Sequence, residues 1–235
     1  MQLFYNSSIT HSQSEIQFSK EESKHIVKVL RKKEGDILHI TNGKGQLFQV
    51  ELGIADVKNC LGQIVSTEDQ EKREYAVHLV VAPTKMNDRF EWFLEKATEI
   101  GVDTITPILC DHSERKIIKA ERFEKIIVSA MKQSLSCYLP KLNPLIGFNE
   151  FISTVDSDHK FIAHCEDGDK STLFNSIKSK SNICILIGPE GDFSINEIEK
   201  AISAGFKPVS LGESRLRTET AAIVACHTVA LKNDN

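Results

Sequence analysis

Two short glycine-bearing segments near the end of the chain are candidates for binding chemistry. Gly188-Pro189-Glu190-Gly191 follows the apolar run 183–187, and Gly212 follows the run 208–211. Glycine lets backbone N–H and C=O groups approach a flat ligand closely, and such groups satisfy the polar edge of an adenine by hydrogen bonds alone. These glycines could therefore frame a nucleoside-like cofactor. Ordinary turns between strands and helices are the alternative.

Arg217 is the arginine best placed to take part in a reaction. It lies between Gly212 and an apolar helix that is expected to begin at Thr218. A guanidinium in this position can orient a carbonyl group or stabilise a developing oxyanion. The alternative is an ion pair with Glu190 or Glu219. His164, at the end of an apolar strand, is a further candidate for contact with a ligand.

Several standard catalytic and nucleotide-binding motifs are missing from the sequence. It has no G-x-x-x-x-G-K-[ST] loop, no G-x-G-x-x-G after a strand, no H-E-x-x-H and no G-x-S-x-G. Among the six cysteines, no two form a C-x-x-C pair, so a zinc site built from neighbouring cysteines is not expected. We expect reduced, mostly buried thiols and no bound metal.

Charge along the chain is balanced overall but clustered locally. The 29 Lys and Arg against 33 Asp and Glu give a net charge of −4, which argues weakly against a dedicated nucleic-acid reader. Two basic clusters could nevertheless neutralise phosphates, or they could be solvated helix faces. The first comprises Lys20, Lys24, Lys28, Arg31, Lys32 and Lys33, and the second comprises Arg115, Lys116, Lys119, Arg122 and Lys125.

Residues 1–72 are expected to form a small β-barrel with one helix. The runs 37–41 and 47–52 flank Asn42-Gly43-Lys44-Gly45, and Asn-Gly between two such runs is a strong hairpin signal. A helix is expected near residues 21–32, and residues 54–65 supply one or two further strands.

A polar stretch at residues 68–74 marks the expected boundary of a second domain, residues 73–235. Apolar strands there alternate with helices, which predicts βαβ units and a largely parallel sheet. Such sheets bind ligands at the carboxyl ends of their strands, where both glycine segments fall. Strands are expected at 76–82, 104–109, 160–165, 183–187 and 208–211, and helices from a cap at Asn87 or Asp88 to Ile100, over 121–138, from a Ser194 capping box to Gly205, and over 218–231.

The sequence gives no sign of a membrane or export segment. No apolar run approaches the roughly 20 residues that span a bilayer. The first residues lack the basic stretch and apolar core of a secretory signal. We therefore expect a soluble, cytoplasmic protein.

The late motifs resemble those of a known family. Gly188-Pro189-Glu190-Gly191, followed by Leu211-Gly212 and by Leu216-Arg217-Thr218-Glu219-Thr220-Ala221, is similar to the cofactor end of the SPOUT methyltransferases. More narrowly, it resembles the bacterial family that methylates N3 of a uracil in small-subunit (16S) ribosomal RNA. Weaker matches run nearly end to end, at His25, Val29-Leu30-Arg31, Gly35-Asp36, Asn42-Gly43, Gly45, Lys85, 98–102, Gln133-Ser134 and Pro140.

The resemblance implies a fold, a cofactor and an assembly. The fold class is α/β, with a carboxy-terminal trefoil-knot (SPOUT) domain and a PUA-like RNA-binding β-barrel over residues 1–72. S-adenosyl-L-methionine is the implied cofactor, bound bent inside the knot of a homodimer whose interface lies at the cofactor site. The implied cofactor-binding residues are His164, Ile187, Gly188, Glu190, Gly191, Leu211, Gly212, Ser214, Leu216 and Arg217.

The implied reaction moves a methyl group from a sulfonium to N3 of a uridine in 16S ribosomal RNA or in the small ribosomal subunit. The N3 proton must leave, since only the anion is a good nucleophile, and nearby positive charge favours that anion. We assign this stabilisation to Arg217, with Glu190 or Glu219 as proton acceptor or orienter. RNA is expected to dock on the amino-terminal domain through Lys24, Lys28, Arg31, Lys32 and Lys33.

Two other functions stay open at this point. One is a SPOUT methyltransferase with another target, either a ribose 2′-OH or a different base. The other is a non-catalytic RNA-binding assembly factor, which is best supported by two departures from the family pattern, at Asp192 and Ser136. Asp192 stands where the family usually has a second glycine, Ser136 where it usually has a basic residue, and Gln2 and Leu3 where it often has an arginine.

Overall fold

The computed structural model describes residues 1–234, which form two compact units. The first comprises Met1–Lys72 and the later segment Met131–Leu139; the second comprises Arg73–Ala130 and the described residues from Pro140 onward. The expected domains were continuous in sequence, with residues 131–139 in the second. Those residues pack instead with the first unit, because they complete its hydrogen bonds.

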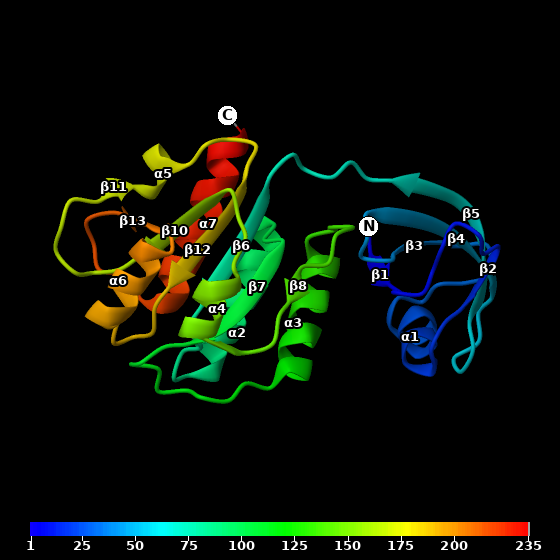
Figure 1. Cartoon of the computed structure of the whole chain (residues 1–235). Helices are drawn as coiled ribbons and strands as arrows, with labels where there is room; N and C mark the ends of the chain where they lie inside the picture. Colours follow the sequence, from blue (N-terminus) through cyan, green and yellow to red (C-terminus); the bar gives the residue numbers. More distant parts are fainter. Residues whose placement is uncertain (235) are drawn as a thin grey trace. The chain divides into compact units, whose positions relative to one another are not determined.

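The first unit is built around a five-stranded sheet (Figure 1). β3 and β4 form the expected hairpin, in which Thr41 pairs with Leu47. Strand β1 pairs in parallel with β3, and the other neighbours are antiparallel. The strand order is β1 (Leu3–Tyr5), β3 (Ile37–Thr41), β4 (Gln46–Ile54), β5 (Leu61–Asp69) and β2 (Glu15–Gln17).

The helix of the first unit begins and ends differently from the expected span 21–32. Helix α1 (Lys20–Lys24) begins after Ser19, whose hydroxyl accepts a hydrogen bond from the Glu22 N–H at 3.2 Å. A single π-helical turn, η1 (His25–Val29), continues it. The backbone then leaves helical geometry, and Arg31 has a φ of +55°.

The segment Met131–Leu139 bonds to the hairpin turn of the first unit. The Cys137 carbonyl accepts hydrogen bonds from the Thr41 hydroxyl at 3.1 Å and the Gly45 N–H at 2.8 Å. The Leu139 N–H donates to the Gly43 carbonyl at 2.9 Å. The Tyr138 hydroxyl donates to the Gln70 carbonyl at 2.7 Å. These bonds satisfy backbone groups that the strands alone leave unpaired.

The second unit contains the predicted parallel sheet (Figure 1). All of its strand pairs are parallel. The strand order is β11 (Ser171–Thr172), β13 (Lys207–Ser210), β10 (His159–Ala163), β12 (Asn182–Ile187), β6 (Ala76–Val81), β7 (Thr104–Leu109) and β8 (Lys141–Leu142), with β9 (Ile146–Gly147) also paired to β7.

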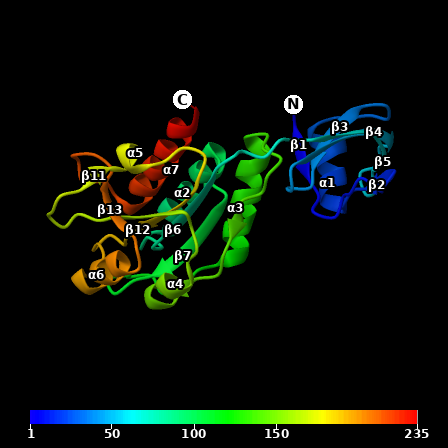
Figure 2. The same cartoon turned by 45° about the horizontal axis from the view of Figure 1, so that its top comes forward.

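Helices cover both faces of this sheet, as a fully parallel sheet requires. Figure 2 shows α2, α5 and α7 on one side and α4 and α6 on the other. Buried side chains of β6 and β12, such as Val80 and Leu186, pack against Phe148 and Phe151 of α4. The helices are α2 (Asn87–Ile100), α3 (Ala120–Gln133), α4 (Phe148–Thr154), α5 (Leu173–Ser176), α6 (Ile195–Ser203) and α7 (Thr218–Asp234).

Several expected helix ends differ from the observed ones, and α7 runs to Asp234, three residues past its expected end. Helix α3 ends at Gln133 and not at Tyr138, and Leu135 adopts a left-handed φ of +59°. Helix α2 is preceded by Met86, which makes no side-chain cap, so Asn87 is its first residue. Gly101 ends α2 with a φ of +106°, and Ser194 and Glu197 form the expected capping box of α6.

Within residues 1–234, no helix combines the length and hydropathy that crossing a bilayer requires. Over the same residues, no cluster of three or more His, Cys, Asp or Glu side chains is arranged to hold a metal ion.

Candidate functional site

A cavity of about 640 Å³ lies at the carboxyl ends of β10, β12 and β13, where a parallel sheet offers a ligand site. Both predicted glycine segments contribute to its wall. Of the residues implied by the family resemblance, nine line the cavity: His164, Ile187, Gly188, Glu190, Leu211, Gly212, Ser214, Leu216 and Arg217. Gly191 and Glu219 are not among its lining residues.

The glycines shape this cavity through close approach and backbone freedom. Gly212 has a φ of +135°, a conformation that side-chain-bearing residues rarely adopt. A Cβ at Gly188 would lie 3.0 Å from the ring of Phe193. Both positions therefore favour glycine, and both leave backbone groups beside the cavity.

Arg217 is free to meet a ligand. Its side chain is exposed and makes no ion pair or hydrogen bond with any residue in the described range 1–234. The alternative expectation, an ion pair of Arg217 with Glu190 or Glu219, is therefore wrong. A guanidinium without a partner at the wall of a cavity can donate hydrogen bonds to the carbonyl oxygens of a base.

The two candidate carboxylates occupy different environments. Glu190 is exposed, and its Oε1 accepts a hydrogen bond from the Lys85 N–H at 2.9 Å, which ties the Gly188–Gly191 loop to the loop after β6. Glu219 lies in the first turn of α7, buried, with its Oε1 3.9 Å from Nε of Arg89. Its Oε2 is buried without a hydrogen-bond partner in the described range. Glu190 is thus the carboxylate that faces the cavity.

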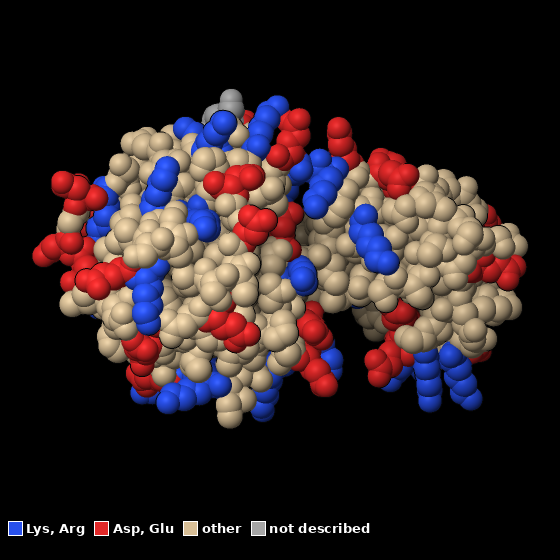
Figure 3. All heavy atoms as spheres, in the orientation of Figure 1, with Lys and Arg blue, Asp and Glu red and all other residues tan. Residues whose placement is uncertain are grey.

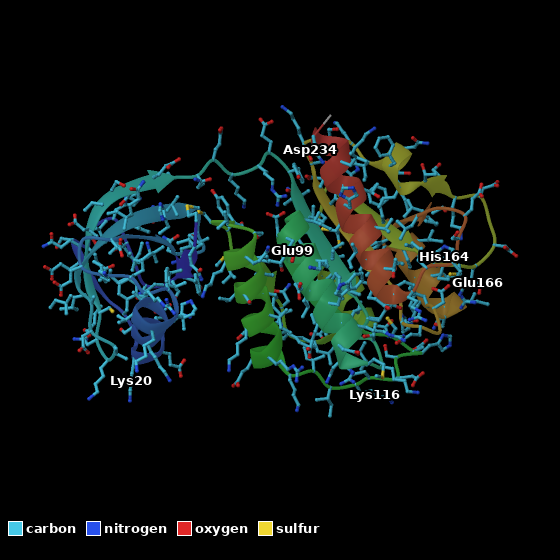
Figure 4. All side chains as sticks on the ribbon, turned by 180° about the vertical axis from the view of Figure 1, so that it is seen from behind. Lys20, Glu99, Lys116, His164, Glu166 and Asp234 are labelled. Carbon is cyan, nitrogen blue, oxygen red and sulfur yellow. The ribbon has the colours of Figure 1, made fainter. Side chains whose placement is uncertain are left out.

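His164 presents two buried, unpartnered nitrogens at the cavity. Neither Nδ1 nor Nε2 has a hydrogen-bond partner among residues 1–234. Burial lowers the pKa of His164, with the positive charge of Lys170 adding to the effect. This shift favours the neutral imidazole, which offers one donor and one acceptor. Figure 4 shows His164 at the start of the loop that carries Glu166.

The sequence did not predict a ligand-binding role for several other polar residues at the cavity, and it marked Asp192 only as a departure from the family pattern. Cys165, Lys170 and Asp192 all line the cavity. The sequence signal available was their position after an apolar strand or within a glycine segment. That position does not reveal which side chains turn inward.

The predicted RNA-binding residues lie together in the first unit. Lys24 belongs to α1, Lys28 to η1, and Arg31, Lys32 and Lys33 to the segment that follows. All are exposed apart from the half-buried Lys32, and none forms an ion pair within the described chain. Figure 3 shows basic side chains projecting from the part of the first unit that α1 occupies, and Figure 4 marks Lys20 there. The arrangement suits phosphate contacts.

Comparison with known proteins agrees with this geometry. Residues 71–230 match the model of the RNA methyltransferase domain family, and residues 18–65 match that of the RNA methyltransferase PUA domain family. Ribosomal RNA small subunit methyltransferase E of Buchnera aphidicola is 35% identical over 220 residues, which cover 88% of this chain and 85% of the relative.

Solved structures show the same fold over the whole length. The crystal structure of a probable rRNA-methyltransferase from Porphyromonas gingivalis has a TM-score of 0.93 and 40% identity, covering 100% of this chain and 99% of the other. Ribosomal RNA small subunit methyltransferase E from Neisseria gonorrhoeae, solved bound to S-adenosyl methionine, has a TM-score of 0.84 and 27% identity, covering 96% and 95%. This chain therefore belongs to the ribosomal RNA small subunit methyltransferase E family.

Proposed function

We propose that this protein transfers a methyl group from S-adenosyl-L-methionine to N3 of a uridine in the 16S ribosomal RNA. Methyl transfer to ribosomal RNA follows from family membership. The choice of uridine N3 rests on the motif resemblance and on the chemistry of the cavity. The observation that carries it is an unpaired arginine, Arg217, at the wall of a cavity built from both glycine loops.

The cavity has the properties that this cofactor needs. Its volume of about 640 Å³ falls within the range of about 300–1,000 Å³ found for small-molecule sites. Gly188 and Gly212 bring backbone groups to its wall, and His164 offers two unpartnered nitrogens. The bound cofactor supplies an activated methyl group on a sulfonium, and the chain has only to position and deprotonate the base.

Arg217 stabilises the deprotonated base in this proposal. Hydrogen bonds from its guanidinium to the uracil carbonyl oxygens favour loss of the N3 proton, because they stabilise the negative charge that remains. Glu190 orients the base or accepts its proton, since one of its oxygens is held by Lys85 and the other is not. Holding N3 in line with the methyl carbon supplies further acceleration.

The first unit is proposed to dock the substrate RNA. The match of residues 18–65 to an RNA methyltransferase PUA domain supports this role. Its unpaired basic residues Lys24, Lys28, Arg31, Lys32 and Lys33 would contact phosphates. The target uridine must be unstacked to enter the cavity, which favours an irregular or single-stranded region.

Two features of the assembly are part of the proposal. The second unit is threaded as a trefoil knot, a rare exception among folds. Tracing residues 182–234 through an electron density map tests this threading.

The protein acts as a homodimer, and the exposed apolar side chains of Met86 and Trp92 at α2 support this assembly. Light scattering tests this, and the expected mass is twice that of one chain.

The decisive experiment uses ribosomal RNA from cells that lack this protein. Incubation of that RNA, or of the isolated small subunit, with protein and S-adenosyl-L-methionine is expected to add one methyl group at one uridine. Mass spectrometry of the released nucleosides then identifies N3-methyluridine. A methyl group on a ribose or on another base would show that the target is not uridine N3. If calorimetry detects no binding of S-adenosyl-L-methionine, the non-catalytic alternative is supported.

A further inference from the structure

The loop from His164 to Lys170 joins β10 to β11 and forms one wall of the cavity through His164, Cys165 and Lys170. It contains three exposed carboxylates, Glu166, Asp167 and Asp169. Loops of this kind are mobile unless their backbone groups are bonded to the rest of the fold. One charged side chain from outside the loop, Asp192, provides such a bond here, and a second at the end of the loop, Lys170, bonds the loop to itself.

Asp192 holds the loop from outside. Its Oδ2 accepts a hydrogen bond from the Cys165 N–H at 2.7 Å, and its Oδ1 accepts one from the Phe193 N–H at 2.8 Å. Only a carboxylate accepts at both oxygens, because an amide would turn a donor toward one of these N–H groups. Hydrogen bonds to an ionised acceptor are also stronger than neutral ones.

The backbone at Asp192 explains how a side chain fits there. Its φ is +62°, in the left-handed region, where aspartate is tolerated better than most residues. Its N–H donates to the Pro189 carbonyl at 2.9 Å, which closes the turn of the glycine segment. The family usually has glycine at this position, which satisfies the backbone but offers no bond to the Cys165 N–H.

Lys170 holds the loop from its far end. Its Nζ donates to the His164 carbonyl at 2.9 Å and to the Glu166 carbonyl at 2.5 Å. These two carbonyls flank Cys165, whose N–H is bound by Asp192. Two opposite charges therefore hold backbone groups of three consecutive residues of the loop, His164, Cys165 and Glu166.

We infer that Asp192 and Lys170 act as a clamp that preforms the 164–170 wall of the cavity and thereby raises the affinity for the cofactor. Both are positioning residues, and the inference rests on the proposed function. When the wall is preformed, the cofactor binds without the entropic cost of ordering the loop. That cost would otherwise lower the affinity. The backbone of His164 is then fixed at the wall, and its two unpartnered ring nitrogens are available to the cofactor's polar groups.

The first test measures the loop without cofactor, by amide hydrogen exchange of the segment 163–170. Asp192→Gly keeps the backbone conformation, since glycine favours positive φ. It is expected to speed exchange at least tenfold. Asp192→Asn, which retains one acceptor oxygen, is expected to fall between this variant and the unchanged protein. Asp167→Asn changes a carboxylate of the same loop that makes no side-chain hydrogen bond or ion pair within residues 1–234, so it serves as the matched control and leaves exchange unchanged.

The second test measures S-adenosyl-L-methionine binding by calorimetry. Asp192→Gly and Lys170→Met are each expected to weaken Kd about tenfold, which corresponds to about 1.4 kcal/mol. The double variant is expected to weaken it little beyond that, because both side chains hold one loop and their effects are not additive. Lys178→Met, an exposed lysine away from the cavity, is the control for lost charge.

The outcomes separate the clamp from the proposed function. Unchanged exchange in Asp192→Gly would overturn the clamp, and so would an additive hundredfold loss in the double variant. Faster exchange with an unchanged Kd would overturn the link to affinity. If the unchanged protein binds no cofactor, the proposed function fails, whereas the exchange experiment still decides whether the clamp exists.

Discussion

The Thr218 hydroxyl donates a hydrogen bond of 3.0 Å to the carbonyl of Gly188, and both residues are buried. This bond joins the start of α7 to the end of β12, and so brings together two glycine segments that are more than twenty residues apart in sequence. It also fixes the backbone directly after Arg217. The side chain of Arg217 is thereby presented from a rigid helix start, although it has no partner of its own.

Arg217→Ala is expected to reduce methyl transfer by about 100-fold to 1,000-fold in kcat, the range found when one stabilising donor is removed. The melting temperature should stay unchanged, because the side chain is exposed and unpaired. The measurement is a steady-state assay with labelled cofactor, beside a thermal melt. Near-normal turnover in a folded variant would remove Arg217 from the mechanism.

Reversal of charge at Lys28, Arg31 and Lys32 is expected to weaken RNA binding and to make it less dependent on salt. The logarithm of the RNA-binding constant falls linearly with the logarithm of the salt concentration. Loss of three phosphate contacts makes this slope less steep by about 2, at roughly 0.7 per contact for single strands. The measurement is filter binding or fluorescence anisotropy over a series of salt concentrations.

The control for that experiment reverses three exposed lysines elsewhere, Lys58, Lys178 and Lys207. This variant has the same net charge but leaves the proposed RNA-binding residues intact, so its salt slope should match that of the unchanged protein. Equal slopes for all three proteins would show that the α1–η1 surface does not contact RNA.

His78 is expected to make the folded state less stable in mild acid. Burial lowers its pKa from 6.5 to about 4, and the positive charge of Lys141 adds to this. Between pH 6.5 and about pH 4, the unfolded chain takes up a proton that the folded chain does not, so stability is full above pH 6.5 and falls as the pH decreases. The difference amounts to about 3 kcal/mol at low pH.

Urea unfolding of the unchanged protein and of His78→Gln isolates the contribution of His78. The free energy of unfolding is measured for both proteins at pH 7.5, 5.5 and 4.5. The variant should lose less stability on acidification, although the lost contact between His78 Nε2 and the Thr106 hydroxyl lowers its stability at pH 7.5. Parallel pH dependence in the two proteins would contradict the assignment.

Cys165 offers a chemical reporter of the cavity, because the other five cysteines are buried. Partial burial raises the pKa of its thiol, and the negative charge of Asp192 raises it further. Asp192→Asn is therefore expected to lower that pKa and to speed modification by an aromatic disulfide reagent at pH 7.5, because the thiolate is the reacting form. Bound cofactor should slow the reaction. Identical rates with and without cofactor would place the ligand away from Cys165.

The elements with strong local signals could be predicted from the sequence. The apolar run 183–187 falls within β12, and Ser194 with Glu197 caps α6 as expected. The short elements β8, β9, α4 and α5 have no such signal, since two to seven residues carry too little periodicity. The helix expected to reach Tyr138 ends at Gln133, because tertiary hydrogen bonds hold residues 137–139 against the hairpin.

The candidate site was predictable where glycine marks it and not where packing decides it. Gly188 and Gly212 identified the two loops, and both line the cavity. Whether Glu219 faces a ligand or Arg89 depends on the rotation of α7, which the sequence does not specify. The same holds for Asp192, whose bond to the Cys165 N–H joins residues 27 apart in the chain.

A chain that ends at residue 72 lacks two hydrogen-bond donors that the complete first unit uses. In the complete chain, the Leu139 N–H donates to the Gly43 carbonyl and the Tyr138 hydroxyl donates to the Gln70 carbonyl. Both donors are synthesised only after residues 73–130, which belong to the second unit. A nascent or truncated chain ending at residue 72 would carry open acceptors and an uncovered hairpin turn, and so would be prone to misassociation. The first unit can therefore be completed only after residue 139 has been synthesised.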